Sequence, residues 1–380
     1  MIKLVSDTID KNDIKSLIEW LDQDPIPRLT KGDLTKELEI KWSNYLGTNY
    51  SVFVNSGSSA ILLTLAALNQ LGRLKNNKIV VPGLSWATDV SSPMLLGLEP
   101  IFCDCNLNDL SCSLADLEIL FARENPSSII LVSPLGLVPN MDKIIKLCKK
   151  YNVLLLEDVC ESMGSKYKEQ YLGTFGIASF FSMYFGHHLS TIEGGFINTN
   201  DEELYHMLLM MRSHGWDRDL PEWKQKELRT KHHTTDFDSL YNFYVPGFNL
   251  RSTDLQAFLG LRAIDKLEKY SKIRNKNFKY YIEKLNNNLN LTIDKENFIS
   301  SFAIPVVSEN RNIIVEKLIE NNIEVRPLIA GNMSNKPMSK EYYRELNNCN
   351  IIESKGFYIP NHQDLTLQEI DKIIDIINSI

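Results

Sequence analysis

Short apolar runs alternate with helix-like segments along the first half of the chain. Between the runs, apolar residues recur at the three- and four-residue spacing of amphipathic helices. Nearly continuous apolar strands are typical of a parallel sheet whose two faces are both covered by helices. The pattern therefore predicts an α/β fold with a mostly parallel sheet. The runs are YSVFV (50–54), KIVVPG (78–83), PIFCDC (100–105), SIILVSPL (128–135) and VLLLED (153–158).

The helical pattern continues at both ends of the chain. An opening helix is predicted over 12–22, and a closing helix over 368–380. A long helix is predicted to start at Thr253 and to lead into a last, smaller part of the chain. There, ISSFAIPVV (299–307) is predicted to form an edge strand, because Pro305 has no N–H to donate to a central ladder.

Composition narrows the class of protein. The 380 residues are 43% hydrophobic and 23% charged with a net charge of −7, which is typical of a globular protein and argues against a general nucleic-acid surface. No apolar stretch approaches the ~18 residues of a membrane span. Residues 1–15 lack the apolar core of a signal peptide. Six cysteines do not suggest a disulfide framework, so a cytoplasmic location is expected.

The charged segment 219–240 lacks clear periodicity, which favours a mobile loop or an intersubunit arm.

Three cysteines lie close together in the spacing C-x-C-x6-C, at Cys103, Cys105 and Cys112. An iron–sulfur cluster takes four thiolates, and no fourth cysteine is nearby in the sequence. The first two also fall on a predicted strand. We therefore expect these cysteines to be structural rather than ligands.

Chemically active residues gather where predicted strands end. The strand 153–158 ends in Asp158. NSGSSA (55–60) lies between a strand and an apolar helix, where backbone N–H groups and the helix dipole attract phosphate, although an ordinary helix cap also fits this turn. The carboxyl ends of parallel strands share one edge of a sheet, so Ser58, Trp86 and Asp158 are expected in one cleft.

The stretch SFFSMYFGHHLSTIEGG (179–195) combines hydroxyl, imidazole and carboxylate groups. It resembles a loop of the DegT/DnrJ/EryC/StrS aminotransferase-like family, the sugar-modifying branch of the fold-type I enzymes that use pyridoxal 5'-phosphate (PLP). The family loop reads S-F-x-x-x-K-x-x-x-x-x-E-G-G, and its lysine bonds to the cofactor. In register with Ser182 and Glu193, the lysine position holds His187. That departure resembles the 3-dehydratases of deoxysugar biosynthesis.

The resemblance implies a fold, a cofactor and a reaction. The expected fold has a large domain with a mostly parallel seven-stranded sheet and a smaller α+β C-terminal domain. The expected cofactor is PLP or its amine form, pyridoxamine 5'-phosphate (PMP), in a homodimer with shared active sites. The expected reaction removes the 3-hydroxyl of a 4-keto-6-deoxy nucleotide sugar, GDP-linked by family likeness, with glutamate as amino donor. The implied parts are an N-terminal segment (1–30), a large PLP-binding domain (31–255), and a linker helix with the small domain (256–380).

Imidazole keeps one of the two roles of the missing lysine. It cannot hold the cofactor covalently, but it can act as a general acid and base near neutral pH. We therefore expect His187 to move the proton. His188 either orients its neighbour or packs.

The resemblance also assigns site residues. Asp158 is expected to bind the pyridine nitrogen and, with His187, to be catalytic. Because guanidinium groups grip oxyanions, Arg251 and Arg326 are candidates for substrate binding, as is His214. The residues expected around the cofactor are Gly57, Ser58, Trp86, Asp158, Glu161, Ser182 and, from the neighbouring subunit, Asn249.

Other functions stay open at this point. One is a nucleotide-sugar aminotransferase that uses another lysine, although Lys166 and Lys168 are out of register. Another is a catalytically silent relative that binds a nucleotide sugar. A third is an iron–sulfur-assisted deoxygenase, which the cysteine placement disfavours.

Overall fold

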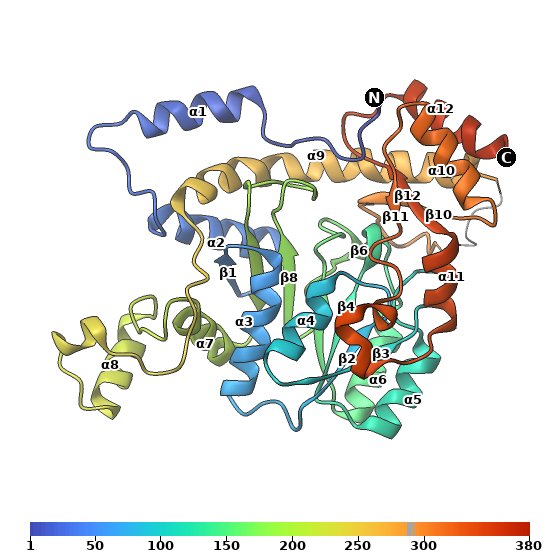
Figure 1. Ribbon diagram of the computed structural model, residues 1–380. Helices are drawn as coiled ribbons and strands as arrows, with labels where there is room; N and C mark the ends of the chain where they lie inside the picture. The colour runs from blue at the N-terminus through green and yellow to red at the C-terminus, as the bar shows by residue number, and fades with distance from the viewer. Residues whose placement is uncertain (287–290, 292) are drawn as a thin grey trace.

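The computed structural model describes residues 1–286, 291 and 293–380. Its central element is a seven-stranded sheet in the order β1-β9-β8-β5-β4-β2-β3 (Figure 1). β9 runs antiparallel to β1 and β8, and the other neighbouring strands are parallel. The predicted α/β fold with a mostly parallel seven-stranded sheet is therefore confirmed. The strands are β1 (Tyr50–Val54), β2 (Lys78–Pro82), β3 (Glu99–Cys103), β4 (Ser128–Val132), β5 (Leu154–Asp158), β8 (Ala178–Ser182) and β9 (Gly195–Thr199).

Helices cover both faces of this sheet. Every residue of β4, β8 and β9 is buried. Because successive strand residues point to opposite faces, a fully buried strand must be covered on both sides. This layering explains the apolar runs and leaves the strand ends as the open part of the sheet. The helices of this region are α2 (Asp33–Leu46), α3 (Gly57–Gln70), α4 (Ala87–Leu95), α5 (Leu114–Glu124), α6 (Met141–Tyr151) and α7 (Glu202–Arg212).

The helix α9 (Asp254–Lys284) extends along one side of the molecule and links its two parts (Figure 1). Thr253 caps its first turn together with Gln256, as the predicted start requires. α9 packs against α1 (Lys11–Leu21), α2 and the last helix. The long helix predicted from Thr253 is thus confirmed.

The C-terminal part is a smaller α+β unit built on a three-stranded antiparallel sheet in the order β10-β12-β11. β10 carries Pro305 and lies at an edge, as predicted. The N-terminus joins this unit, because Ile2 pairs with Ile323. The division into 1–30, 31–255 and 256–380 stays a prediction. The elements are β10 (Ala303–Val307), α10 (Arg311–Glu320), β11 (Arg326–Pro327), α11 (Asn347–Lys355), β12 (Gly356–Pro360) and α12 (Leu367–Asn378).

One local prediction is wrong. The segment expected to be a mobile loop forms the helix α8 (Glu222–Lys231). Hydrophobic periodicity is missing because α8 buries none of its residues. Polar contacts hold it instead: Lys224 pairs with Glu227 at 2.7 Å, and Arg229 pairs with Asp217 at 2.8 Å. An intersubunit role for this segment stays a prediction.

The remaining elements are short. Among the residues that the structure describes, a two-stranded hairpin and four 3-10 turns connect the larger elements. Across the described ranges, no helix has the length and apolarity needed to cross a bilayer. The short elements are β6 (Lys166–Tyr167), β7 (Gln170–Tyr171), η1 (Pro134–Gly136), η2 (Asp238–Tyr241), η3 (Met333–Asn335) and η4 (Pro337–Tyr342).

Candidate active site

A cavity of about 1140 Å³ opens at the carboxyl ends of β5 and β8. Its wall combines the β1–α3 turn, the start of α4, the loop after β8, the N-terminal residues 1–7 and strands of the C-terminal unit. Ser58, Trp86 and Asp158 all line it, so the structure brings together the three strand-end residues expected in one cleft. This is the edge at which α/β sheets bind their ligands.

The β1–α3 turn offers backbone N–H groups at one end of the cavity. The helix begins at Gly57, and the side chain of Ser56 caps it. Gly57, Ser58 and Ser182 line the cavity. A Cβ at Gly195 would lie 2.5 Å from the nitrogen of Gly57, so the Gly-Gly pair lets β9 approach the turn closely. First-turn N–H groups and two hydroxyls make a set of donors that suits a phosphate.

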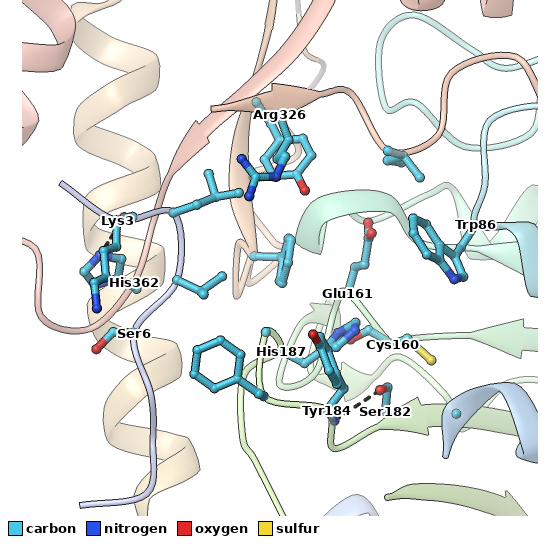
Figure 2. Close-up of a pocket in the computed structure, with 18 of the residues that line it drawn as sticks. Lys3, Ser6, Trp86, Cys160, Glu161, Ser182, Tyr184, His187, Arg326 and His362 are labelled. Carbon is cyan, nitrogen blue, oxygen red and sulfur yellow. Dashed lines mark hydrogen bonds between the residues drawn. The ribbon is translucent and has the colours of Figure 1, made fainter. Parts of the chain in front are cut away.

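Carboxyl groups contribute to the wall of the cavity. Asp158 ends β5 and is only 6% exposed, and its Oδ1 accepts a hydrogen bond from the N–H of Cys160 at 2.9 Å. Glu161 accepts from the N–H of Leu135 at 2.9 Å, and burial raises the pKa of Glu161 to about 7. Trp86 stands at the rim with 60% of its surface exposed (Figure 2). A carboxyl group at a strand end, in one cavity with an open indole, suits a flat, protonated heterocycle.

His187 lines the cavity and lies beside Cys160 and Glu161 (Figure 2). Its Nδ1 is 2.7 Å from the carbonyl oxygen of Cys160. A carbonyl can only accept, so we assign the ring hydrogen to Nδ1, which leaves Nε2 as the basic nitrogen. Burial lowers the pKa of His187 below 6.5, and the cation of Arg274 lowers it further, against opposing effects of the Cys160 carbonyl and Asp158. The ring is therefore neutral at pH 7.

His188 takes a different place from its neighbour. It is 1% exposed and does not line the cavity. Its Nε2 lies 2.8 Å from the carbonyl oxygen of Ser300, and its ring packs near Phe302. Of the two readings left open for His188, packing is therefore the one that its position supports.

Comparison with known proteins agrees with this geometry. The sequence profile of the DegT/DnrJ/EryC1/StrS aminotransferase family matches residues 7–378. The chain belongs to this family. It is 32% identical to a GDP-4-keto-6-deoxy-D-mannose 3-dehydratase of Escherichia coli O55:H7 over 98% of each chain. A protein of the same name from Yersinia pseudotuberculosis is also 32% identical, over 98% of this chain and 97% of the relative.

Solved structures show the same similarity. A GDP-4-keto-6-deoxymannose-3-dehydratase with a trapped PLP–glutamate geminal diamine superposes with a TM-score of 0.90 and 31% identity, over 99% of this chain and all of the other. A mutant of an enzyme of this name with bound GDP-perosamine gives a TM-score of 0.89 and 30% identity over 99% and 100%. These relatives share the fold along nearly the whole chain.

Not every residue expected at the family site reaches the cavity. Arg326 lines it, and its guanidinium donates to Glu324 at 2.6 Å. Asn249, Arg251 and His214 do not line it in this single chain. Arg251 donates to the side chain of Asn249 at 3.0 Å, and Asn249 is exposed. Their roles stay predictions.

Sequence reasoning missed two parts of the cavity wall. Asp89 lines it and is fully buried. An acidic residue in the first turn of a helix is so ordinary that it gives no separate signal. Residues 1–7 also line the cavity, because Ile2 pairs with Ile323 and the carbonyl of Lys3 lies 3.2 Å from Nε2 of His362. Only tertiary structure shows that contact.

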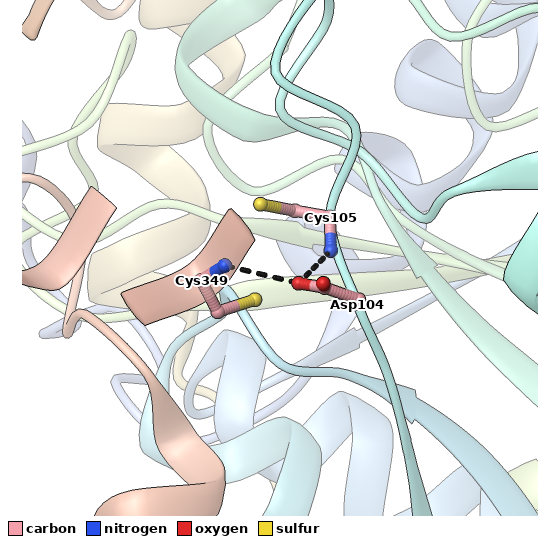
Figure 3. Close-up of side chains that lie close together, drawn as sticks. All are labelled: Asp104, Cys105 and Cys349. Atoms are coloured by element: carbon pink, nitrogen blue, oxygen red, sulfur yellow. Dashed lines mark hydrogen bonds between the residues drawn. The ribbon is translucent and has the colours of Figure 1, made fainter. Parts of the chain in front are cut away.

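A group formed by Asp104, Cys105 and Cys349 lies outside the cavity and joins the two parts of the molecule. Cys349 of α11 meets Asp104 and Cys105 after β3, with their ligand atoms within 4.8 Å of one another (Figure 3). The carboxylate of Asp104 accepts from the N–H groups of Cys105, Asn348 and Cys349 at 2.8 to 3.0 Å. Within the described residues, two sulfurs and a carboxylate engaged with the backbone fall short of the four thiolates of an iron–sulfur cluster.

Proposed function

We propose that this protein is a PLP/PMP-dependent 3-dehydratase that removes the 3-hydroxyl of GDP-4-keto-6-deoxymannose, with glutamate as amino donor. One observation carries the proposal: a neutral histidine, His187, faces the cavity where the family places a lysine. The relatives named as 3-dehydratases of this substrate support it, because their similarity covers nearly the whole chain.

The cavity residues fit the cofactor. The N–H groups at Gly57 and Ser58, with the hydroxyl of Ser182, would hold its phosphate. Trp86 would stack on the ring, and Asp158 would accept from the protonated ring nitrogen. Glu161 would face the ring hydroxyl. When bound, the cofactor supplies an electron sink for bond cleavage at the sugar.

His187 would supply the proton transfers. Its Nε2 is free to accept a proton, since the Cys160 carbonyl holds the other nitrogen. The resulting imidazolium would be stabilised by that carbonyl and by the charge of Asp158. The same Nε2 could then donate the proton to the departing 3-hydroxyl, which leaves as water. A ring whose pKa lies below neutral accepts and returns a proton readily at pH 7.

An aminotransferase is the second candidate, and the lysines of the chain disfavour it. Lys168 pairs with Asp142 at 2.8 Å, Lys166 lies over the ring of Tyr171, and neither lines the cavity. Lys3 does line the cavity, but it lies beside His362, on the other side of the cavity from Trp86 (Figure 2). A catalytically silent relative that only binds a nucleotide sugar is also disfavoured, because the residues expected to transfer protons and to hold the cofactor are all present.

We further propose a cytoplasmic homodimer with shared active sites. The segment beyond α8 exposes large aromatic side chains, with Phe237 81% and Tyr241 78% exposed. Exposed apolar patches of this kind are typical of interaction surfaces. Asn249 is also exposed, so it is accessible to a partner's cofactor. The six cysteines are free thiols, as a reducing compartment requires.

The proposal is tested by incubating the protein with PLP, glutamate and GDP-4-keto-6-deoxymannose and following the sugar nucleotide by mass spectrometry. We expect a product that has exchanged the 3-hydroxyl for hydrogen, together with ammonia and 2-oxoglutarate. An amino sugar with its 3-hydroxyl intact would instead identify an aminotransferase. Binding without turnover would identify a silent relative. The UDP- and dTDP-linked 4-keto-6-deoxy sugars serve as controls for the nucleotide.

A further inference from the structure

Asp89 is a buried carboxyl group that lacks an ordinary hydrogen-bond partner. It lies in the first turn of α4, is fully buried and contributes to the cavity wall. Neither of its carboxylate oxygens has a hydrogen-bond partner of the usual kind among the described residues. A buried polar group without a partner is costly, so its position calls for a physical reason.

The neighbour that explains Asp89 is a second carboxyl group. Asp158, at the end of β5, is buried in the wall of the same cavity and is the hydrogen-bonding neighbour of Asp89 there. Two carboxylates cannot accept from each other, but a carboxylic acid can donate to a carboxylate. Two such groups in a buried site share one proton, because a second negative charge beside the first is unfavourable. The pair therefore carries one proton and one charge.

The surroundings decide which member holds the proton. Asp158 has an N–H donor, that of Cys160, which stabilises its ionised form. Asp89 has none among the described residues. Burial raises the pKa of Asp89 well above its usual range, and Asp158, Glu161 and the thiol of Cys112 raise it further. Cys160 also faces this pair. The proton thus belongs on Asp89 and the charge on Asp158.

We propose that Asp89 is a positioning residue that stays protonated and donates a hydrogen bond to Asp158, which keeps Asp158 ionised and directed at the cavity. This inference rests on the proposed function only where it assigns the ring nitrogen of PLP to Asp158. Asp89 acts through Asp158, so its effect is on the hydrogen bonding and orientation of that carboxylate.

The first test uses the cofactor-free protein. At pH 8 Glu161 is mostly ionised, since its pKa is about 7. The infrared difference spectrum of wild type minus Asp89→Asn should then show the carbonyl band of a protonated carboxylic acid. Asp33→Asn, at a fully exposed carboxyl group, is the matched control and should show only the loss of an ionised carboxylate. The same carboxylate signal from Asp89→Asn would overturn the proposal.

The second test follows PLP binding by absorbance from pH 4 to 9. Asparagine can donate to Asp158 as a protonated acid does, so Asp89→Asn should bind PLP within about threefold of wild type. Asp89→Ala loses the donor, so it should bind PLP about tenfold more weakly than wild type at pH 8. If Asp89 were a second anion, Asp89→Asn would weaken binding at pH 8 by about tenfold or more. That loss would contradict the proposal, whereas a wild type that fails to bind PLP would contradict the proposed function instead.

Discussion

At the scale of single residues, hydrogen bonds to backbone carbonyls determine what each of two adjacent histidines can do. His187 has its Nδ1 engaged by Cys160 and its other nitrogen free, whereas His188 is sealed in the interior against Ser300. Both have lowered pKa values because both are buried. Only the first, however, lines the cavity. The proposed base is therefore selected by backbone geometry rather than by residue type.

A nitrogen-15 NMR titration of the cofactor-free protein tests this geometry. We expect His187 to be neutral at pH 7 with its proton on Nδ1, and to become charged only as the pH falls below 6.5, because its pKa is lowered. Its capacity to accept a proton should be lost over the same range. The signal is assigned by its absence in His187→Asn. A ring that is already cationic at pH 7, or that carries its proton on Nε2, would refute the assignment.

The place of a residue in the cavity could be predicted from the sequence only where a motif isolated that residue. The spacing from Ser182 to Glu193 identified His187, and strand ends identified Asp158 and Trp86, which all line the cavity. Asp89 was not predicted, because its significance lies in its neighbour Asp158, which is distant in the sequence at the end of β5. No local pattern reports such a contact.

At the scale of elements, apolar runs bounded by turns predicted five strands of the large sheet, with each end within three residues of its position in the structure. Because each of these strands is buried on both faces, nearly all of its residues are apolar, and such a run is easily recognised in the sequence. The exposed helix α8 escaped prediction for the opposite reason, since it buries nothing. The contact between Asp104 and α11 could not be predicted either, because it joins residues 245 positions apart.

That contact gives a stability prediction. Asp104 accepts from two N–H groups at the start of α11, Asn348 and Cys349, and so attaches the C-terminal unit to the sheet. Asp104→Ala should lower the free energy of unfolding by about 2 kcal/mol, because these partly buried N–H groups lose their acceptor. Urea unfolding measures it. Asp104→Asn keeps one acceptor oxygen and should cost less, and Asp142→Ala, at a mostly exposed carboxylate, should cost little. Equal losses in all three variants would disprove the capping role.

At the scale of the whole molecule, the cavity is assembled from distant parts of the chain. Residues 1–7, the sheet edge and the C-terminal unit all contribute to its wall. Asn249 and Arg251 stay outside it, which is consistent with the proposed homodimer in which each subunit completes the site of the other. The shared site can be tested by complementation.

Two inactive variants should restore activity when mixed as hybrids. His187→Ala removes the proposed base, and Asn249→Asp places a negative charge where the partner's cofactor phosphate is expected. After joint refolding, half of the dimers should be hybrids, and each hybrid should hold one intact site. About a quarter of wild-type activity is then expected, because a two-fold dimer exchanges the same residues in both directions. Activity no higher than the sum of the separate variants would show that the sites are not shared.

The most direct test of the missing covalent bond is the intact mass of the protein after incubation with PLP and reduction with borohydride. Wild type should keep its unmodified mass, because His187 cannot form a reducible bond to the cofactor. His187→Lys should gain the mass of one reduced cofactor per chain and lose dehydration of the sugar nucleotide. Stoichiometric labelling of the wild type on any lysine, or unchanged dehydration by His187→Lys, would contradict the proposal that a histidine moves the proton while the cofactor stays unbonded.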